Sequence, residues 1–306
     1  MSEPLIAVMG QTCSGKTALA IRVAAELDGE IVSCDSAAIF IGLDIGTAKP
    51  TGAEQAAAPH HLIDVLSPDR QWTAADFARA ADAAITDIRG RGRVPILCGG
   101  TGLWMRALVR GIFEAPAIDP EVREKVRDEL AERGSELMHE ELRRVDPLAA
   151  SRIESKDPQR IGRALEVFRQ TGRPISEFQE AHRFAEERHR LIGIAPAWPK
   201  ETLWSRIAAR TERMFAEGIL EETQTALDAG IAPDAPGLSI IGYRDAVAVL
   251  GGRMTHAEAV ERTTIETRQY AKRQKNWFNK EPDVWWVDAE AGPDSLVAQL
   301  VERWRS

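Results

Sequence analysis

Residues Gly10-Gln-Thr-Cys-Ser-Gly-Lys-Thr17 fit the pattern G-x-x-x-x-G-K-[ST] of a phosphate-binding loop. Its glycines allow a tight turn in which successive backbone N–H groups point at an anion, and a following helix adds its positive N-terminal end. An apolar run, Leu5–Met9, precedes the loop, and residues 16–27 place apolar side chains every four positions. This order of strand, loop and helix predicts a phosphate-loop α/β fold.

Strand-like and helical segments continue to alternate along the chain. The predicted strands are residues 5–9, 30–33, 61–65, 94–98, 191–195 and 284–287. The predicted helices include residues 16–27, 73–89, 256–280 and 295–305, with Thr73 and Asp76 as a capping pair. This alternation predicts a parallel sheet flanked by helices.

The character of the sequence changes after Asp119. Residues 121–190 are charged and helical in pattern, with little strand signal, before the strand pattern returns at Leu191. We therefore expect an α/β core formed by residues 1–118 and 190–306, interrupted by an all-helical insertion at residues 119–189.

The bulk composition is that of a soluble globular protein. The chain has 306 residues, 44% hydrophobic and 28% charged, with no apolar run long enough for a membrane span and no signal-peptide pattern at its start. We expect a cytoplasmic, monomeric protein without a membrane partner. The net charge is −8, but residues 262–280 hold six basic side chains and one acidic, a local balance of +5 that suits a polyanion.

One acidic residue is predicted to lie beside the phosphate loop. Nucleotide triphosphatases usually close a second apolar strand with an acid that holds the metal, but residues 94–98 end in Gly99-Gly-Thr101. Asp35 instead follows the other predicted strand. By spacing alone, Asp35 is open to three roles: a metal ligand, a general base or a helix N-cap.

Several longer segments of the sequence narrow the possible roles of Asp35. They are Gly10-Gln-Thr-Cys-Ser-Gly-Lys-Thr17, Asp35-Ser-Ala-Ala-Ile-Phe40, Asp44-Ile-Gly-Thr-Ala-Lys-Pro50, His60-His-Leu-Ile-Asp64, Gly99-Gly-Thr-Gly-Leu-Trp104, Asp157-Pro-Gln-Arg-Ile-Gly-Arg-Ala-Leu-Glu166, Gly242-Tyr-Arg-Asp245 and Ala271-Lys-Arg-Gln274. In these segments and their order the chain resembles the tRNA dimethylallyltransferases, also called tRNA isopentenyltransferases. The resemblance implies transfer of a dimethylallyl group from dimethylallyl diphosphate to the exocyclic N6 amine of the adenosine 3′-adjacent to the tRNA anticodon. The phosphate loop would then hold the diphosphate leaving group and need no ATP.

The resemblance also implies roles for individual residues. Asp35 matches the general base, Thr101 a hydroxyl on the bridging oxygen of the donor, and Arg123 a cation that neutralises the departing diphosphate. Lys16 would act on the distal phosphate, together with a Mg²⁺ ion bound at Thr17. Thr101 also suits a helix N-cap, and Arg123 lies in a charge-rich segment where a surface role is the alternative.

The expected binding residues form two sets. The diphosphate set is Gly10, Gln11, Thr12, Cys13, Ser14, Gly15, Lys16 and Thr17. The set for the tRNA anticodon stem-loop is Asp35, Ser36, Ala37, Ala38, Gln159, Arg160, Ile161, Gly162, Arg163, Ile240, Ile241, Gly242, Tyr243, Arg244 and Asp245. An RNA base must leave its stack to react, so the adenosine should be flipped into the protein.

The resemblance is not complete, and other functions compete. Phe40 stands where the family usually has Tyr, which removes one hydroxyl. The alternatives are an adenylate isopentenyltransferase acting on a free nucleotide, an ATP-dependent small-molecule kinase, and an RNA-binding phosphate-loop switch. The helical insertion and the basic segments favour the larger RNA substrate.

Overall fold

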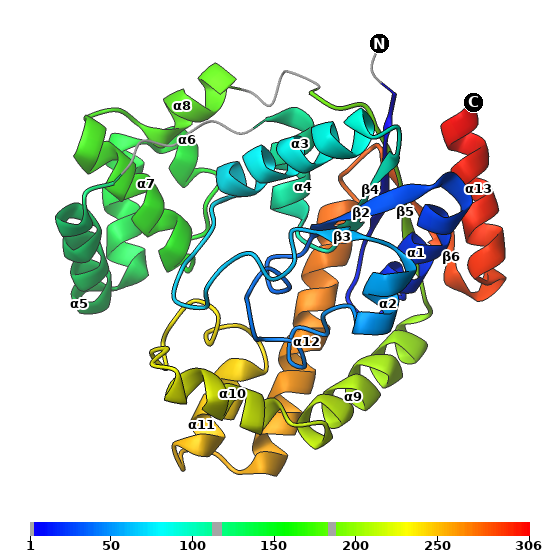
Figure 1. Cartoon of the computed structure of the whole chain (residues 1–306). Helices are drawn as coiled ribbons and strands as arrows, with labels where there is room; N and C mark the ends of the chain where they lie inside the picture. Colours follow the sequence, from blue (N-terminus) through cyan, green and yellow to red (C-terminus); the bar gives the residue numbers. More distant parts are fainter. Residues whose placement is uncertain (1–2, 112–117, 183–187) are drawn as a thin grey trace. The chain divides into compact units, whose positions relative to one another are not determined.

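The computed structural model describes residues 3–111, 118–182 and 188–306 (Figure 1). The chain divides into two compact units, Met1–Val109 with Arg188–Ser306, and Arg110–Glu187. The second unit corresponds to the insertion predicted at residues 119–189, with its boundaries placed at Arg110 and Glu187. Within the described ranges, no helix has the length and apolar character needed to cross a membrane.

Within the described residues, a six-stranded parallel sheet forms the centre of the first unit. Its strands are β1 (Leu5–Met9), β2 (Gly29–Cys34), β3 (His60–His61), β4 (Val94–Gly99), β5 (Leu191–Ala197) and β6 (Val284–Asp288). They are ordered β3-β2-β4-β1-β5-β6, and every neighbouring pair is parallel. The loops that follow β1, β2 and β4 therefore meet at one edge of the sheet, where α/β proteins place their ligands.

Helices cover both faces of this sheet. The helices of this unit are α1 (Lys16–Leu27), α2 (Gly52–Ala57), α3 (Ala74–Gly90), α4 (Gly102–Arg110), α9 (Lys200–Ala216), α10 (Ile219–Asp228), α11 (Tyr243–Leu250), α12 (His256–Phe278) and α13 (Pro293–Arg305), with a short 3₁₀ helix at Ala289–Ala291. Val8 of β1, Val23 of α1 and Leu300 of α13 share one buried cluster, so α1 and α13 cover the same face. Burying each such side chain contributes about 1.5–3 kcal/mol. α3 packs on β2 and β4 outside that cluster, which places it on the opposite face.

The second unit is helical throughout its described residues. Its helices are α5 (Pro120–Val145), α6 (Pro147–Ala150), α7 (Pro158–Thr171) and α8 (Ile175–His182). Asp119, Asp146 and Asp157 each precede a proline at the first turn of a helix, and each carboxylate accepts a free backbone N–H there. The fold class predicted from the sequence, a phosphate-loop sheet with a helical insertion, is confirmed.

One predicted strand is wrong in extent. The sequence predicted a strand over residues 61–65, but β3 contains only His60 and His61. Leu62 and Asp64 have φ angles of 62° and 52°, a left-handed backbone that ends an extended strand. The turn directs the Asp64 carboxylate to the buried Lys49, whose Nζ lies 2.5 Å away. By contrast, the capping pair Thr73 and Asp76 is confirmed at the start of α3.

Candidate active site

The phosphate loop, residues 10–17, joins β1 to α1. Gly15 has a φ of 90° and sits at the N-cap of α1, a left-handed conformation that favours glycine. The loop is held from outside: Trp198 Nε1 donates to the Ser14 carbonyl at 3.0 Å, and Arg206 Nε donates to the Cys13 carbonyl at 2.9 Å. The loop is therefore shaped before any anion arrives.

Two side chains of the loop lack the partners that an anion would supply. Lys16 Nζ donates to the Gln11 carbonyl at 2.5 Å. Burial lowers the pKa of Lys16, although the negative charge of Asp35 acts in the opposite direction. Ser14 is buried, and its Oγ has no hydrogen-bond partner among the described residues. An anionic ligand would satisfy the Ser14 hydroxyl and favour the charged form of Lys16.

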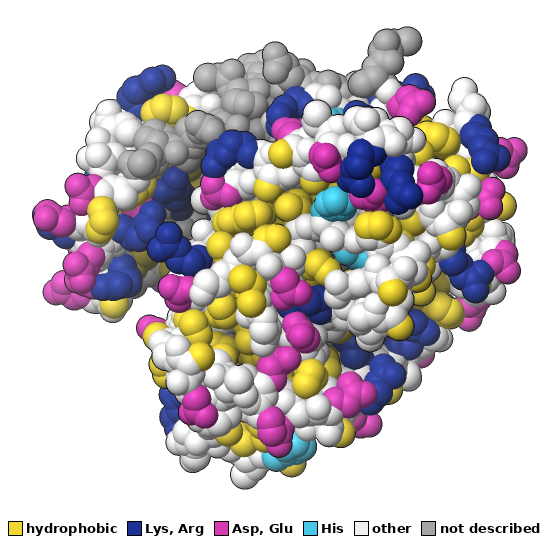
Figure 2. Space-filling view, viewed as in Figure 1, with side chains coloured by type: hydrophobic (Ala, Val, Ile, Leu, Met, Phe, Trp, Pro, Cys, Tyr) yellow, Lys and Arg dark blue, Asp and Glu magenta, His cyan; other side chains and the backbone are white. Residues whose placement is uncertain are grey.

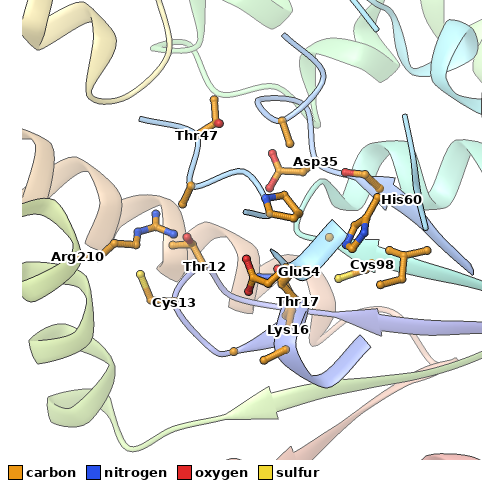
Figure 3. A pocket seen from close by; sticks show the side chains of 18 of the residues that line it. Thr12, Cys13, Lys16, Thr17, Asp35, Thr47, Glu54, His60, Cys98 and Arg210 are labelled. Atoms are coloured by element: carbon orange, nitrogen blue, oxygen red, sulfur yellow. The ribbon is translucent and has the colours of Figure 1, made fainter. Parts of the chain in front are cut away.

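A cavity of roughly 780 Å³ opens over this loop. Figure 3 shows Asp35, Thr12, Lys16 and Thr17 around it, with His60 and Cys98 on one side and Arg210 on the other. The cationic side chains that line the cavity are Lys16, Arg206, Arg210 and Arg213, against the carboxylates Asp35 and Glu54. This excess of positive charge suits a ligand with several negative charges.

Asp35 and Thr101 lie at the ends of adjacent strands. Asp35 follows β2, and its Oδ1 accepts the Ala37 N–H at 2.9 Å. The Thr101 N–H donates to the Cys34 carbonyl at 3.1 Å, and Thr101 Oγ1 accepts the Ser36 N–H at 3.0 Å. The sheet therefore places Thr101 beside the residue that follows Asp35. Within the described residues Asp35 forms no ion pair, which leaves its carboxylate available to a ligand.

The buried thiols are not suited to nucleophilic catalysis. Burial raises the pKa of the Cys98 thiol to about 12, and it also raises the pKa of Cys34. Both thiols are therefore protonated at neutral pH, although Cys98 lines the cavity. Cys98 therefore does not compete with Asp35 as a proton acceptor in the cavity.

The segment 44–50 forms another wall of the cavity. Glu222 of α10 holds it, because its carboxylate accepts the backbone N–H groups of Asp44 at 2.8 Å and Ile45 at 3.0 Å. Tyr243 donates its hydroxyl to the same carboxylate. Lys49 is buried and binds Asp44 Oδ1 at 2.5 Å. These contacts place Thr47, Ala48 and Pro50 against the cavity.

Two residues of the predicted RNA-binding set are buried in the protein interior. Tyr243 and Asp245 are fully buried, and Asp245 accepts hydrogen bonds from Arg262 Nε and Thr263 Oγ1, each at 2.6 Å. Arg244 is exposed and pairs with Glu266. Asp245 therefore joins α11 to α12, Tyr243 joins α11 to α10 and Gly46, and Arg244 is the member of this motif that solvent reaches.

The remaining predicted residues lie in the second unit. Gln159 and Arg160 are exposed at the start of α7, whereas Ile161 and Gly162 are buried in that unit. Arg123 is exposed on α5. These positions leave their roles in binding or catalysis as predictions.

Sequence reasoning missed the arginines of α9. Arg206, Arg210 and Arg213 recur at intervals of four and three residues, so they share one face of the helix. That spacing is the sequence signal from which these arginines could have been predicted to share a helix face. On α12 the basic patch is smaller than the sequence implied, because Arg262 is paired with Asp245, while Lys272, Arg273 and Lys275 are exposed.

Figure 2 shows hydrophobic side chains gathered in the middle of one face of the molecule. Ile41 and Val65, from the segments after β2 and β3, are 51% and 42% exposed. The two segments are joined where the Ile41 N–H donates to the Leu66 carbonyl at 2.9 Å. Exposed apolar surface of this kind commonly marks an interaction site.

Comparison with known proteins gives a consistent result. The sequence pattern of the IPP transferase family matches residues 38–281. The tRNA dimethylallyltransferase of Geobacter sulfurreducens is 44% identical over 292 residues, 95% of this chain and 94% of that protein. The tRNA dimethylallyltransferase of Anaeromyxobacter dehalogenans is 46% identical over 299 residues, 98% of this chain and 99% of that protein.

Solved structures agree with the sequences. The tRNA isopentenylpyrophosphate transferase of Bacillus halodurans superposes with a TM-score of 0.73 at 32% identity, covering 99% of this chain and 97% of that one. A eukaryotic dimethylallyltransferase, solved while acting on tRNA, gives a TM-score of 0.78 at 25% identity, covering 94% of this chain and 74% of that one. The similarity therefore extends through both units of the chain.

Proposed function

The chain belongs to the IPP transferase family, and on that premise we propose that it transfers a dimethylallyl group from dimethylallyl diphosphate to an adenosine of tRNA. The acceptor is the exocyclic N6 amine of the adenosine 3′-adjacent to the anticodon, and diphosphate is released. The observation that carries this proposal is a cationic cavity lined by both the phosphate loop and Asp35, whose carboxylate forms no ion pair with the described residues. We place the reaction in the cytoplasm and assign it to a monomer.

The phosphate loop and α9 hold the diphosphate. The loop amides, Lys16 and the Ser14 hydroxyl meet one side of the anion, and Arg210 and Arg213 approach from α9. The effective dielectric constant of a partly buried cavity is lower than that of water, which makes such charged contacts stronger. This arrangement accounts for a phosphate loop in an enzyme that does not consume ATP.

A magnesium ion fits beside this anion. Among the described residues, no group of three His, Cys, Asp or Glu side chains is arranged to hold a metal by itself. Mg²⁺ commonly binds through one protein oxygen together with substrate phosphates and water, and the Thr17 hydroxyl lines the cavity. When bound, the ion would neutralise charge on the departing diphosphate.

The reaction is a displacement at the first carbon of the prenyl group. The adenine nitrogen forms the new C–N bond, the C–O bond to diphosphate breaks, and Asp35 accepts the proton that the amine loses. A positioned base of this kind typically contributes a factor of about 10²–10⁴ in rate. Thr101 donates to the bridging oxygen as its charge grows, while Lys16 stabilises the distal phosphate. Arg123 of the helical unit is assigned to the same departing anion.

RNA binds through backbone contacts and a flipped base. The exposed Lys272, Arg273 and Lys275 of α12 supply charge for phosphates, and Gln159 to Arg163 supply amide and guanidinium groups from α7. Bases in RNA loops are readily splayed out, so the anticodon loop can deliver its adenosine to Asp35. We assign residues 35–38 to the base pocket, and Asp35 and Ala38 line the cavity.

One assay tests the proposal against its alternatives. The protein is incubated with Mg²⁺, dimethylallyl diphosphate and unmodified tRNA, and the digested nucleosides are identified by mass. We expect prenylated adenosine from tRNA and none from free AMP. Prenylation of AMP in place of tRNA would establish the free-nucleotide alternative, and ATP hydrolysis without prenyl transfer would establish a kinase or a switch.

A further inference from the structure

A single buried amide joins the phosphate loop to the loop that carries Thr101. Gln274 of α12 is only 5% exposed. Its Oε1 accepts the Thr12 N–H at 2.7 Å, and its Nε2 donates to the Gly100 carbonyl at 3.0 Å. Both ends of the amide are therefore occupied, each by the backbone of a different active-site loop.

The contact is reciprocal and closely fitted. Gln11 of the phosphate loop donates its Nε2 to the Ala271 carbonyl of α12 at 3.0 Å. A Cβ atom on Gly100 would lie 2.0 Å from Gln274 Nε2, so any larger residue at position 100 would displace the amide. Two glutamines and one glycine thus lock α12 to the ends of β1 and β4.

These contacts act on residues that neighbour the groups assigned to the reaction. Thr12 lies within the phosphate loop that is assigned to the diphosphate. Gly100 directly precedes Thr101, which is assigned to the bridging oxygen. The bond from the Thr12 N–H to Gln274 fixes the conformation of the phosphate loop. Lys272, Arg273 and Lys275 stand exposed on the same helix.

We propose that Gln274 is a positioning residue for prenyl transfer, holding the phosphate loop and Thr101 at the spacing that the diphosphate requires. This inference rests on the proposed function. Gln274 touches neither substrate, and it acts through the two backbone groups that it fixes. A shift of about 1 Å in such groups can lower a rate by roughly 10²-fold, even where the moved residue does no chemistry.

The first test replaces Gln274 by an isosteric apolar residue. Gln274→Met keeps the volume and removes both hydrogen bonds, and the matched control is Gln269→Met on the exposed side of the same helix. We expect Gln274→Met to lower kcat by about 10- to 100-fold and to raise the KM for dimethylallyl diphosphate by about tenfold. The Kd for tRNA should stay within about twofold of that of Gln269→Met, because the RNA-facing side chains are unchanged.

A second variant supplies a pH signature that a purely structural residue would not give. The protonated side chain of Gln274→Glu reproduces both contacts, since its O–H can donate to Gly100 and its C=O can accept from Thr12. The ionised form cannot donate, and burial favours protonation. Burial and the charge of Asp35 raise the pKa of the adjacent Tyr270, which therefore stays neutral. We expect the kcat of Gln274→Glu, relative to wild type, to rise as the pH is lowered from 8 to 6.

The outcomes are distinguishable. If the wild-type protein forms no prenylated adenosine, the proposed function fails, and calorimetric binding of inorganic diphosphate to Gln274→Met still tests the positioning role. If the wild type is active and Gln274→Met matches Gln269→Met in kcat and KM, the inference is overturned. Equal loss of tRNA binding and turnover would also overturn it. If Gln274→Met fails to fold, a relative kcat of Gln274→Glu that does not change with pH overturns it.

Discussion

Strand β2 has a carboxylate near each end, and the two have opposite surroundings. Glu30, near the start, has a side chain that is 1% exposed and binds Arg91 Nη1 and His61 Nε2, each at 2.6 Å. Asp35, just beyond the other end, accepts a single N–H from Ala37 and faces the cavity. The first carboxylate is fully satisfied by protein, whereas the second is open to the cavity, where we propose that it meets the substrate.

Electrostatics explains why both arrangements are stable. A buried charge is tolerated only where it is paired and hydrogen-bonded. Burial alone would raise the pKa of Glu30, but hydrogen bonds from Arg91 and His61 outweigh it, so its pKa is lowered. Asp35 is partly exposed and therefore needs no such set of partners. It can remain ready to accept a proton.

The largest expected effect comes from neutralising the carboxylate that faces the cavity. Asp35→Asn keeps the shape of the side chain but cannot accept a proton. We expect kcat to fall by about 10³-fold, within the usual range of 10²–10⁴ for a general base. Single-turnover prenyl transfer measures the loss. The Kd for tRNA and the unfolding midpoint serve as controls, and a kcat within threefold of wild type would refute the base assignment.

The next effect is on stability and leaves chemistry intact. Glu30→Gln removes the charge shared by Arg91, Arg93 and His61, and we expect a loss of about 2 kcal/mol in the free energy of unfolding. The figure is below the usual cost of breaking a buried pair, because the side chains of Arg91 and Arg93 are 45% and 39% exposed. Urea unfolding measures it, with the exposed Glu26→Gln as control. Lower kcat in the folded variant would mean that the two ends of β2 are not independent.

The sequence was sufficient where structure is local. The phosphate loop, the helix after it and the Thr73 capping box depend on neighbouring residues, and each is confirmed. The proximity of Asp35 to the loop followed from parallel strands, whose ends share one edge of the sheet. Long-range rules of this kind work when they depend on topology and not on single side chains.

The rest depended on packing that no local pattern encodes. The short β3 follows from left-handed residues whose turn is fixed by Lys49, far along the chain. The spacing of the α9 arginines was visible, but the face that meets the cavity is set by how α9 packs on α12. Tyr243 matched a motif for RNA contact, yet Glu222 and Gly46 occupy its hydroxyl.

A smaller effect tests the cationic side of the same cavity. Arg206 is committed to the Cys13 carbonyl and to the Trp198 ring, 4.7 Å away, whereas Arg210 forms no ion pair within the described part of the chain. We expect Arg210→Ala to raise the KM for dimethylallyl diphosphate about tenfold, or about 1.4 kcal/mol, with a smaller change in kcat. Steady-state kinetics at fixed tRNA measures this, with Arg305→Ala on α13 as control. An unchanged KM would remove Arg210 from the diphosphate site.

The smallest effect is the loss of the Glu30 contribution to stability at acid pH. Because the pKa of Glu30 is lower in the folded than in the unfolded state, its contribution is complete above the unfolded pKa of about 4.3 and is lost as the pH falls through the folded value. The stability difference between wild type and Glu30→Gln should therefore narrow as the pH falls below about 4. Urea unfolding of both proteins above and below this pH provides the measurement. A difference that widened below pH 4 would mean that Glu30 is stabilised in its protonated form, and the contrast with Asp35 would then lose its electrostatic basis.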